Sequence, residues 1–75
     1  MDLPITKMNT FSERLREMRK FKGLSQRQVA ETLKLSTRTY AHYEQGDREP
    51  NIATLTKLCD LLDVPADYLI GRIDY

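Results

Sequence analysis

Four residues near the middle of the chain have side chains that suit contacts to flat hydrogen-bonding groups. The four are Thr37, Arg38, Ala41 and His42. At 100° per residue of a helix they fall largely on the side away from Tyr40 and Tyr43. Arginine can donate two parallel hydrogen bonds to guanine, threonine and alanine can touch a thymine methyl group, and histidine can bond to a base or a phosphate. The pattern therefore predicts contacts to the edges of nucleic-acid bases.

The chain offers little for catalysis. Cys59 and His42 are its only cysteine and histidine, so a zinc-type ligand cluster is not expected, and we expect neither a metal nor a cofactor. The sequence contains no glycine-rich phosphate loop, and 75 residues leave little room for a catalytic cleft. We expect a protein that is not an enzyme, with Cys59 as a core residue in a stripe of leucines.

The net charge of +1 is unevenly divided. Residues 1–48 hold ten Lys/Arg and six Asp/Glu, whereas residues 49–75 hold two and five. This division predicts one face made for a polyanion, with chance in a short chain as the alternative. The start, MDLPITKM, lacks the apolar run of a secretory signal, and no stretch approaches the roughly 20 apolar residues of a membrane span. We expect a cytoplasmic protein without membrane contact.

Residues that favour the start or the end of a helix recur regularly along the chain. Residue types that favour a helix N-cap stand at Thr10, Ser25, Ser36 and Asn51. Glycines suited to a left-handed C-terminal position stand at Gly23, Gly46 and Gly71. These signals predict five helices, over about 11–21, 26–33, 37–45, 52–62 and 65–70, with Pro65 in the first turn of the last. No segment shows the alternation of a strand, so the expected fold is an all-α, compact five-helix bundle.

Apolar residues recur at spacings of three and four in these helices, which predicts their inward faces. The inward set is Phe11, Leu15, Met18, Val29, Ala30, Leu33, Ile52, Leu55, Leu58, Cys59 and Leu62. Helices 26–33 and 37–45 are separated only by Lys34, Leu35 and Ser36, so they must cross steeply. In such a helix-turn-helix the second helix projects from the surface and can enter a major groove.

From about Leu15 to Gly71 the sequence resembles the lambda-repressor-like, Cro/CI-type helix-turn-helix regulators, also called the Xre family. The resemblance rests on Leu15-Arg16, Arg19, Gly23-Leu24-Ser25-Gln26, Val29-Ala30, Leu35-Ser36, Thr39-Tyr40, Tyr43-Glu44, Gly46, Pro50, Leu55, Leu58, Leu62-Asp63-Val64 and Asp67-Tyr68-Leu69-Ile70-Gly71. It implies an N-terminal arm over 1–10, a DNA-binding domain over 11–71 and a short tail over 72–75.

The resemblance also implies roles for single residues. The base-reading positions are Thr37, Arg38, Ala41 and His42. The DNA-backbone contacts are Gln26, Arg27, Lys34, Ser36, Gln45 and Arg48. Arg19 and Glu44 match a partly buried ion pair with a structural role. Of the basic run Arg16, Arg19, Lys20 and Lys22, otherwise a solvated helix face, one or two members are expected to help with phosphates.

By this resemblance we expect a bacterial or phage-encoded, sequence-specific regulator of transcription. It would act as a repressor that binds double-stranded DNA as a homodimer at a pseudo-palindromic operator. The alternative is a protein-interaction module on the same fold, such as an autoregulating antitoxin or the target of an anti-repressor, with a protein partner. An exposed apolar patch at Phe21 or in the tail Ile73–Tyr75 would favour the alternative.

Overall fold

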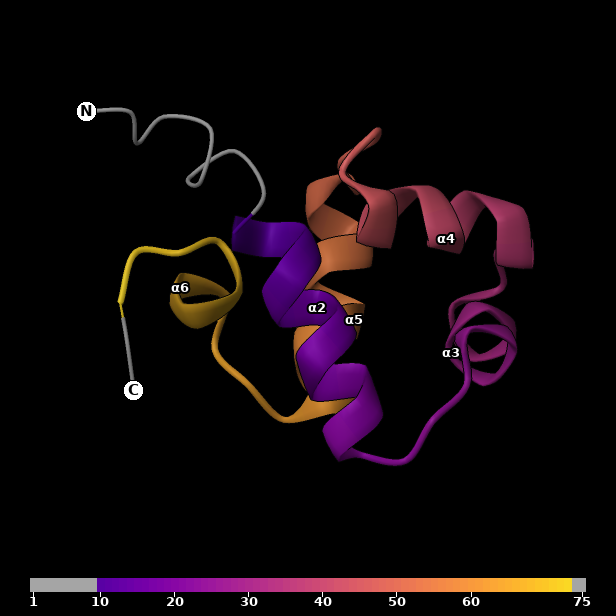
Figure 1. Cartoon of the computed structure of the whole chain (residues 1–75), viewed down its shortest axis with the longest axis horizontal. Coiled ribbons are helices and arrows are strands. Elements are labelled where there is room, and N and C mark those ends of the chain that lie inside the picture. The colour runs from indigo at the N-terminus through magenta and orange to yellow at the C-terminus, as the bar shows by residue number, and fades with distance from the viewer. Residues whose placement is uncertain (1–9, 74–75) are drawn as a thin grey trace.

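The computed structural model describes residues 10–73 of the chain. This part is all-α, as predicted, and contains no strand. Its five helices are α2 (Thr10–Phe21), α3 (Gln26–Leu33), α4 (Thr37–Gln45), α5 (Ile52–Leu62) and α6 (Ala66–Leu69) (Figure 1). Within the described range, none of these helices has the length and apolarity to cross a membrane. Most of the predicted arm and the last two residues of the predicted tail lie outside the described residues.

The helices enclose one apolar core. α2 packs against α4 and α6, while α5 packs against α3 and α6 (Figure 1). The core residues are Leu15, Val29, Ala30, Leu33, Tyr40, Tyr43, Leu58 and Leu62. The two tyrosine rings meet edge to face, with centroids 6.1 Å apart. Every inward residue predicted from spacing is buried or half-buried except one, which is discussed below.

Local hydrogen bonds fix the start of α3 and the start of α4. At the start of α3, the Ser25 hydroxyl accepts from the Gln28 backbone N–H, and the Gln28 side chain accepts from the Ser25 N–H. Lys34 ends α3 in the left-handed conformation, with φ of 62°. Two residues later, the Ser36 hydroxyl caps α4 by accepting from the Thr39 N–H. The direction of α4 relative to α3 is therefore set by nearby side chains.

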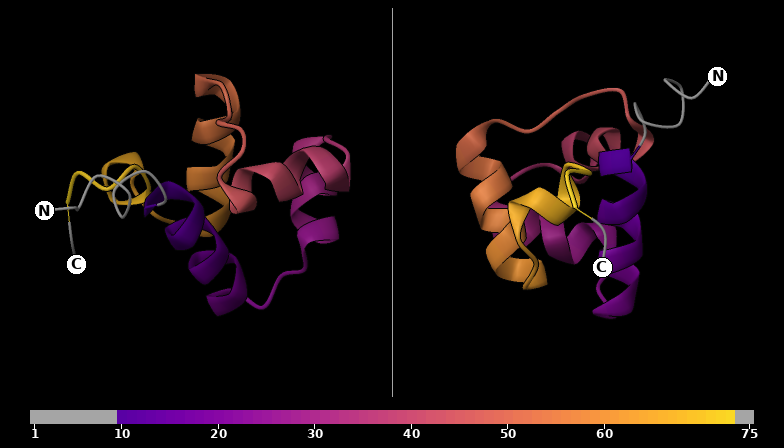
Figure 2. Two further views of the ribbon diagram at one scale, coloured as in Figure 1. Left: turned by 45° about the horizontal axis from the view of Figure 1, so that its top comes forward. Right: turned by 90° about the vertical axis from the view of Figure 1, so that its left-hand side faces the viewer.

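Two expectations about single residues of the last two helices are wrong. Ile52 was predicted to face inward, yet it is 81% exposed. It occupies the first turn of α5, which projects beyond α3 and α6, so the inward stripe has nothing there to pack against (Figure 2). Pro65 was predicted inside the first turn of α6, but it precedes the helix as its N-cap, with ψ of 152°. Its carbonyl accepts from the N–H groups of Tyr68 and Leu69, as an N-cap carbonyl does.

The residues after α6 fold back onto the start of α2. Arg14 donates from Nη1 to the carbonyls of Tyr68 and Ile73, at 2.6 and 2.7 Å, and its guanidinium lies 4.3 Å from the centre of the Tyr68 ring. Gly71, with φ of +86°, sits against Thr10, which belongs to α2 itself instead of preceding it as the predicted cap. This packing holds the end of the domain beside the first turns of α2.

Candidate nucleic-acid interface

The helix α4 has two faces of opposite character. Its inner face carries Tyr40, Tyr43 and Glu44, all buried. Its outer face carries the predicted base-reading residues together with Gln45. Of these, Thr37, Arg38 and Gln45 are exposed, and Ala41 and His42 are half-buried. Arg38, Ala41 and Gln45 follow the spacing of one helical stripe, so a ligand that lies along the helix can touch all three.

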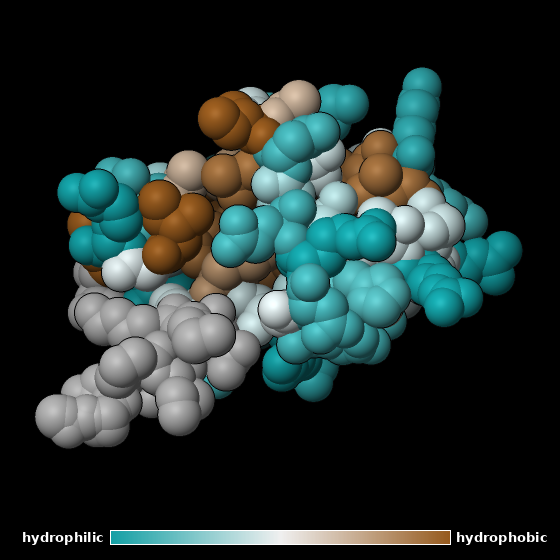
Figure 3. Space-filling model, turned by 90° about the horizontal axis from the view of Figure 1, so that it is seen from above, coloured by the Kyte–Doolittle hydropathy of each residue, from teal (hydrophilic) through white to brown (hydrophobic). Residues whose placement is uncertain are grey.

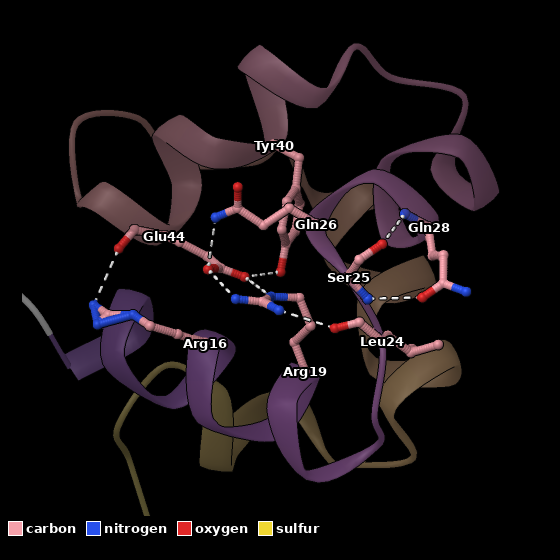
Figure 4. A network of polar contacts seen from close by, with 8 residues as sticks. All are labelled: Arg16, Arg19, Leu24, Ser25, Gln26, Gln28, Tyr40 and Glu44. Carbon is pink, nitrogen blue, oxygen red and sulfur yellow. Dashed lines mark hydrogen bonds and ion pairs between the residues drawn. The ribbon is translucent and has the colours of Figure 1, made fainter.

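Glu44 holds the inner face in place through a cluster of polar contacts. Its carboxylate accepts from Arg19 Nε at 2.6 Å and Nη2 at 3.1 Å, from Gln26 Nε2 at 3.0 Å, and from the Tyr40 hydroxyl (Figure 4). Each carboxylate oxygen therefore accepts two hydrogen bonds. Arg19 also donates from Nη1 to the Leu24 carbonyl at 2.9 Å. Because these donors come from α2, α3 and α4, the cluster joins three helices at one buried point.

The charges within this cluster are mutually supporting. Burial alone would raise the pKa of Glu44, but hydrogen bonds from Arg19, Tyr40 and Gln26 outweigh it, and the pKa lies below its usual value. The hydrogen bond to Glu44 raises the pKa of Arg19. Burial, followed by the hydrogen bond to Glu44, raises the pKa of the Tyr40 hydroxyl well above its usual range. The pair is thus ionised and the tyrosine neutral at neutral pH.

The half-buried His42 has a partner of its own. Its Nδ1 lies 3.0 Å from a carboxylate oxygen of Asp47, in the loop that follows α4. The ring therefore turns toward the edge of the outer face, and Nε2 is the atom that remains for a base or a phosphate. Arg38 differs, because it makes no hydrogen bond or ion pair within residues 10–73.

The predicted DNA-backbone residues fall in separate places. Gln26 and Gln45 line one cleft between α2 and α4. Lys34 and Ser36 are exposed in the turn at the other end of α3, and Arg48 is exposed in the loop after α4.

Two of the six have side chains engaged within the protein in addition to Gln26. Arg27 forms an exposed pair with Glu31, with Nε 3.1 Å from Oε2. The Ser36 hydroxyl both caps α4 and donates to the Thr39 hydroxyl. Both residues are nevertheless exposed to solvent.

The cleft between α2 and α4 is lined by further residues besides the predicted DNA-backbone contacts. It has a volume of about 490 Å³ and is open to solvent. Besides the two glutamines, α2 contributes Ser12, Glu13, Arg16, Arg19 and Lys20. The basic run of α2 was a visible signal, but only the folded chain shows which of its members turn toward α4. In the view of Figure 3, hydrophilic side chains dominate the side formed by α2 and α4, whereas hydrophobic ones gather around α5 and α6.

Comparison with curated proteins finds relatives of one kind. The SPbeta prophage-derived uncharacterized HTH-type transcriptional regulator YonR of Bacillus subtilis is 43% identical over 60 residues, covering 80% of this chain and 56% of the relative. The cryptic phage CTXphi transcriptional repressor RstR of Vibrio cholerae is 37% identical over 60 residues, covering 80% of this chain and 54% of the relative. The chain spans about half the length of the curated relatives it matches.

Solved structures share the fold. A transcriptional regulator from Listeria innocua superposes with a TM-score of 0.78 at 35% identity, over 87% of this chain and 61% of that one. The restriction-modification controller protein C.AhdI from Aeromonas hydrophila superposes with a TM-score of 0.76 at 33% identity, over 85% of this chain and 97% of that one. The helix-turn-helix domain family matches residues 12–74. The chain therefore belongs to the helix-turn-helix domain family of the kind found in transcriptional regulators.

Proposed function

We propose that this chain is the DNA-binding part of a sequence-specific regulator of transcription, which reads the major groove with the outer face of α4. The observation that carries the proposal is the exposed stripe of α4, where Arg38 projects without a protein partner among the described residues. An arginine in that position can donate both of its hydrogen bonds to one guanine. Thr37, Ala41 and His42 add contacts beside it, and the domain extends over residues 11–71.

The regulator acts as a repressor and binds as a homodimer. The repressor name of the Vibrio relative and the prophage origin of the Bacillus relative support the first part. The general docking geometry of helix-turn-helix proteins supports the second part, because one recognition helix reads one half-site. Two copies would place two recognition helices about one helical turn apart on a pseudo-palindrome. The setting that goes with this function is the cytoplasm of a bacterium, where the DNA lies.

Selection of genomic DNA fragments by the purified chain, followed by sequencing, tests this function. The selection is run at about 150 mM salt, where nonspecific attraction is partly screened. A recovered pseudo-palindrome with half-sites one turn apart supports the proposal. Recovery without any sequence preference would contradict it, and a size measurement of the complex on the recovered site decides between one and two copies.

One observation favours the interaction module as a second candidate. Phe21, at the end of α2, is 78% exposed, which is unusual for so large an apolar side chain. In this alternative Phe21 contacts a small protein partner encoded beside the chain, as an autoregulating antitoxin would. Co-expression with the neighbouring gene tests it: a complex that survives purification, and is lost in Phe21→Ser while DNA binding remains, supports the second candidate.

A further inference from the structure

We infer that Asp47 is a positioning residue for base reading, because it holds the His42 ring so that Nε2 accepts a hydrogen bond from the amino group of a DNA base. In the major groove this group is N6 of adenine or N4 of cytosine. The inference rests on the proposed function and deepens it. It adds Asp47 to the residues that determine specificity, and it states which kind of base group His42 reads.

The backbone at the end of α4 brings the two side chains together. Gly46, which is left-handed with φ of 86°, shares its N–H between the carbonyls of His42 and Tyr43, at 3.1 and 3.4 Å. The Asp47 N–H donates to the His42 carbonyl at 3.1 Å. These bonds form a Schellman motif, which commonly sets the side chains of residues five apart against each other. Here that contact is polar, with Nδ1 of His42 3.0 Å from Oδ2 of Asp47.

The carboxylate of Asp47 decides which nitrogen of the ring carries the hydrogen. An ionised carboxylate only accepts hydrogen bonds, so the Nδ1 beside it must be the donor. In a neutral imidazole one nitrogen donates and the other accepts. Nε2 of His42 is therefore an acceptor, and it lies on the edge of the ring that is turned away from Asp47.

The position of His42 suits contact with a base. It lies one turn after Arg38 on the outer face of α4, and its side chain is 33% exposed, so one edge of the ring is held while the other reaches solvent. Side chains one turn apart on a helix are about 5–6 Å from each other, and successive bases of a strand are about 3.4 Å apart. The base group that His42 reads therefore lies within about two base pairs of the base that Arg38 reads.

The major groove presents groups of both kinds. The amino groups of adenine and cytosine donate, whereas O6 of guanine and O4 of thymine accept. An accepting Nε2 matches an amino group and would face a keto oxygen as one acceptor against another. A ring with its hydrogen on Nε2 would have the opposite preference. The carboxylate of Asp47 therefore determines which kind of group is bound.

Nitrogen NMR of the free chain tests the tautomer. His42 is the only histidine of the sequence, so the imidazole signals of an untagged, isotope-labelled chain need no assignment. A long-range proton–nitrogen correlation spectrum is recorded at about pH 8.5, where an ordinary imidazole is neutral. We expect hydrogen on Nδ1 in this chain and a shift of the population toward Nε2 in Asp47→Ala. A ring of the original chain with hydrogen on Nε2, alone or together with Nδ1, would overturn the inference.

Operators that lack one base group test the readout. The position to alter is the one at which His42→Ala loses base preference in selection. There, purine in place of adenine, or 2-pyrimidinone in place of cytosine, removes the amino group. 2-Aminopurine in place of guanine, or 5-methyl-2-pyrimidinone in place of thymine, removes the keto oxygen. Loss of the amino group should weaken the original chain about fivefold more than His42→Ala. Loss of the keto oxygen should weaken the two proteins equally.

A matched pair of variants separates positioning from charge. Glu49 is an exposed carboxylate of the same loop, so Asp47→Ala and Glu49→Ala each remove one negative charge and should bind every operator more tightly. Asp47→Ala should lose the dependence on the amino group, as His42→Ala does, whereas Glu49→Ala should keep it. A purely structural Asp47 would change binding to all operators alike. Retained dependence in Asp47→Ala, equal loss in Glu49→Ala, or dependence on the keto oxygen would overturn the inference.

The same measurements separate this inference from the proposed function. Selection that recovers no operator removes the sequence-specific regulator and this inference with it. A recovered operator at which His42→Ala relaxes no position, or whose amino group is read without Asp47, keeps the regulator and removes only this inference.

Discussion

The two faces of α4 differ in where their hydrogen bonds are made. On the inner face, Glu44 accepts from three other side chains, and its own side chain is only 3% exposed. On the outer face, Arg38 stands in solvent with no partner in the described part of the chain. The difference indicates that a polar side chain with hydrogen bonds inside the protein positions the helix. A polar side chain without such hydrogen bonds is available to a ligand. Gln26 combines both kinds, because its Nε2 donates one hydrogen bond to Glu44 and carries a second N–H.

The largest effect should come from breaking the inner face. Arg19→Ala leaves Glu44 buried without its countercharge, and loss of one partner of such a pair costs about 3–5 kcal/mol. A chain of 75 residues has only about 4–11 kcal/mol of stability in total. Urea should therefore unfold the Arg19→Ala variant at a much lower concentration than the original chain. Arg27→Ala is the control, because its pair with Glu31 is exposed and should contribute at most about 0.5 kcal/mol. Equal losses in the two variants would contradict the distinction.

Acid should weaken the same face in a predictable direction. The pKa of Glu44 is lower in the folded chain than the ordinary value of 4.5, so the ion pair stabilises the domain above that value. The contribution is lost as the pH falls through the lower, folded pKa. Carboxyl NMR shifts should show Glu44 titrating below 4.5, with the unfolding midpoint falling over the same interval. A Glu44 carboxyl that titrates at or above the ordinary glutamate value would refute the assigned balance of burial and hydrogen bonding.

The outer face should respond in binding and not in stability. Arg38→Ala is expected to cost about 1–3 kcal/mol of binding free energy per half-site and to relax the preference at one base pair. The free energy of unfolding should change by no more than about 0.5 kcal/mol. Titrations against the selected site and its single-base variants measure the binding free energy and the base preference, and urea unfolding measures the stability. Arg48→Ala is the comparison, since a phosphate contact should weaken every sequence by about the same factor. Uniform loss in Arg38→Ala would remove it from base reading.

Sequence reasoning succeeded where the deciding contacts are local. The capping bonds of Ser25, Ser36 and Asn51 join residues three apart, so α3, α4 and α5 begin where the sequence indicated. The exposure of Ile52 and the hydrogen bond from Gln26 to Glu44 depend on helices that are distant in the chain. The spacing of residues within one helix therefore does not predict them.

The left-handed Asp63 that ends α5 was missed although a signal existed. Asp63 has φ of 58° and stands two residues before Pro65. Aspartate tolerates the left-handed region better than most residues, and proline is common just after such a helix end. For the candidate site, the buried and exposed faces of α4 could be predicted from the sequence. The cleft could not, because Arg16 and Lys20 were indistinguishable from the rest of a basic helix face.

The smallest expected effect lies in the turn between α3 and α4. Lys34 holds a left-handed conformation that costs a residue with a side chain roughly 1–2 kcal/mol, so Lys34→Gly should stabilise the fold by up to about 1 kcal/mol after the added flexibility of the unfolded chain is counted. If Lys34 contacts a phosphate, as expected, the variant should also lower by about 0.9 the salt slope of DNA binding, which is the slope of log K against the logarithm of the salt concentration.

Asp63→Gly is the matched change for that prediction, since its φ of 58° is nearly that of Lys34 and it ends α5 instead of the turn before α4. It should stabilise less, because aspartate already tolerates the conformation. It should leave the DNA salt slope no smaller, because it removes a negative charge. A Lys34→Gly variant that is more stable, and whose DNA binding has an unchanged salt slope, would show that Lys34 has a structural role and no contact with DNA. The DNA-binding surface would then be confined to the outer face of α4, the cleft and the loop of Arg48.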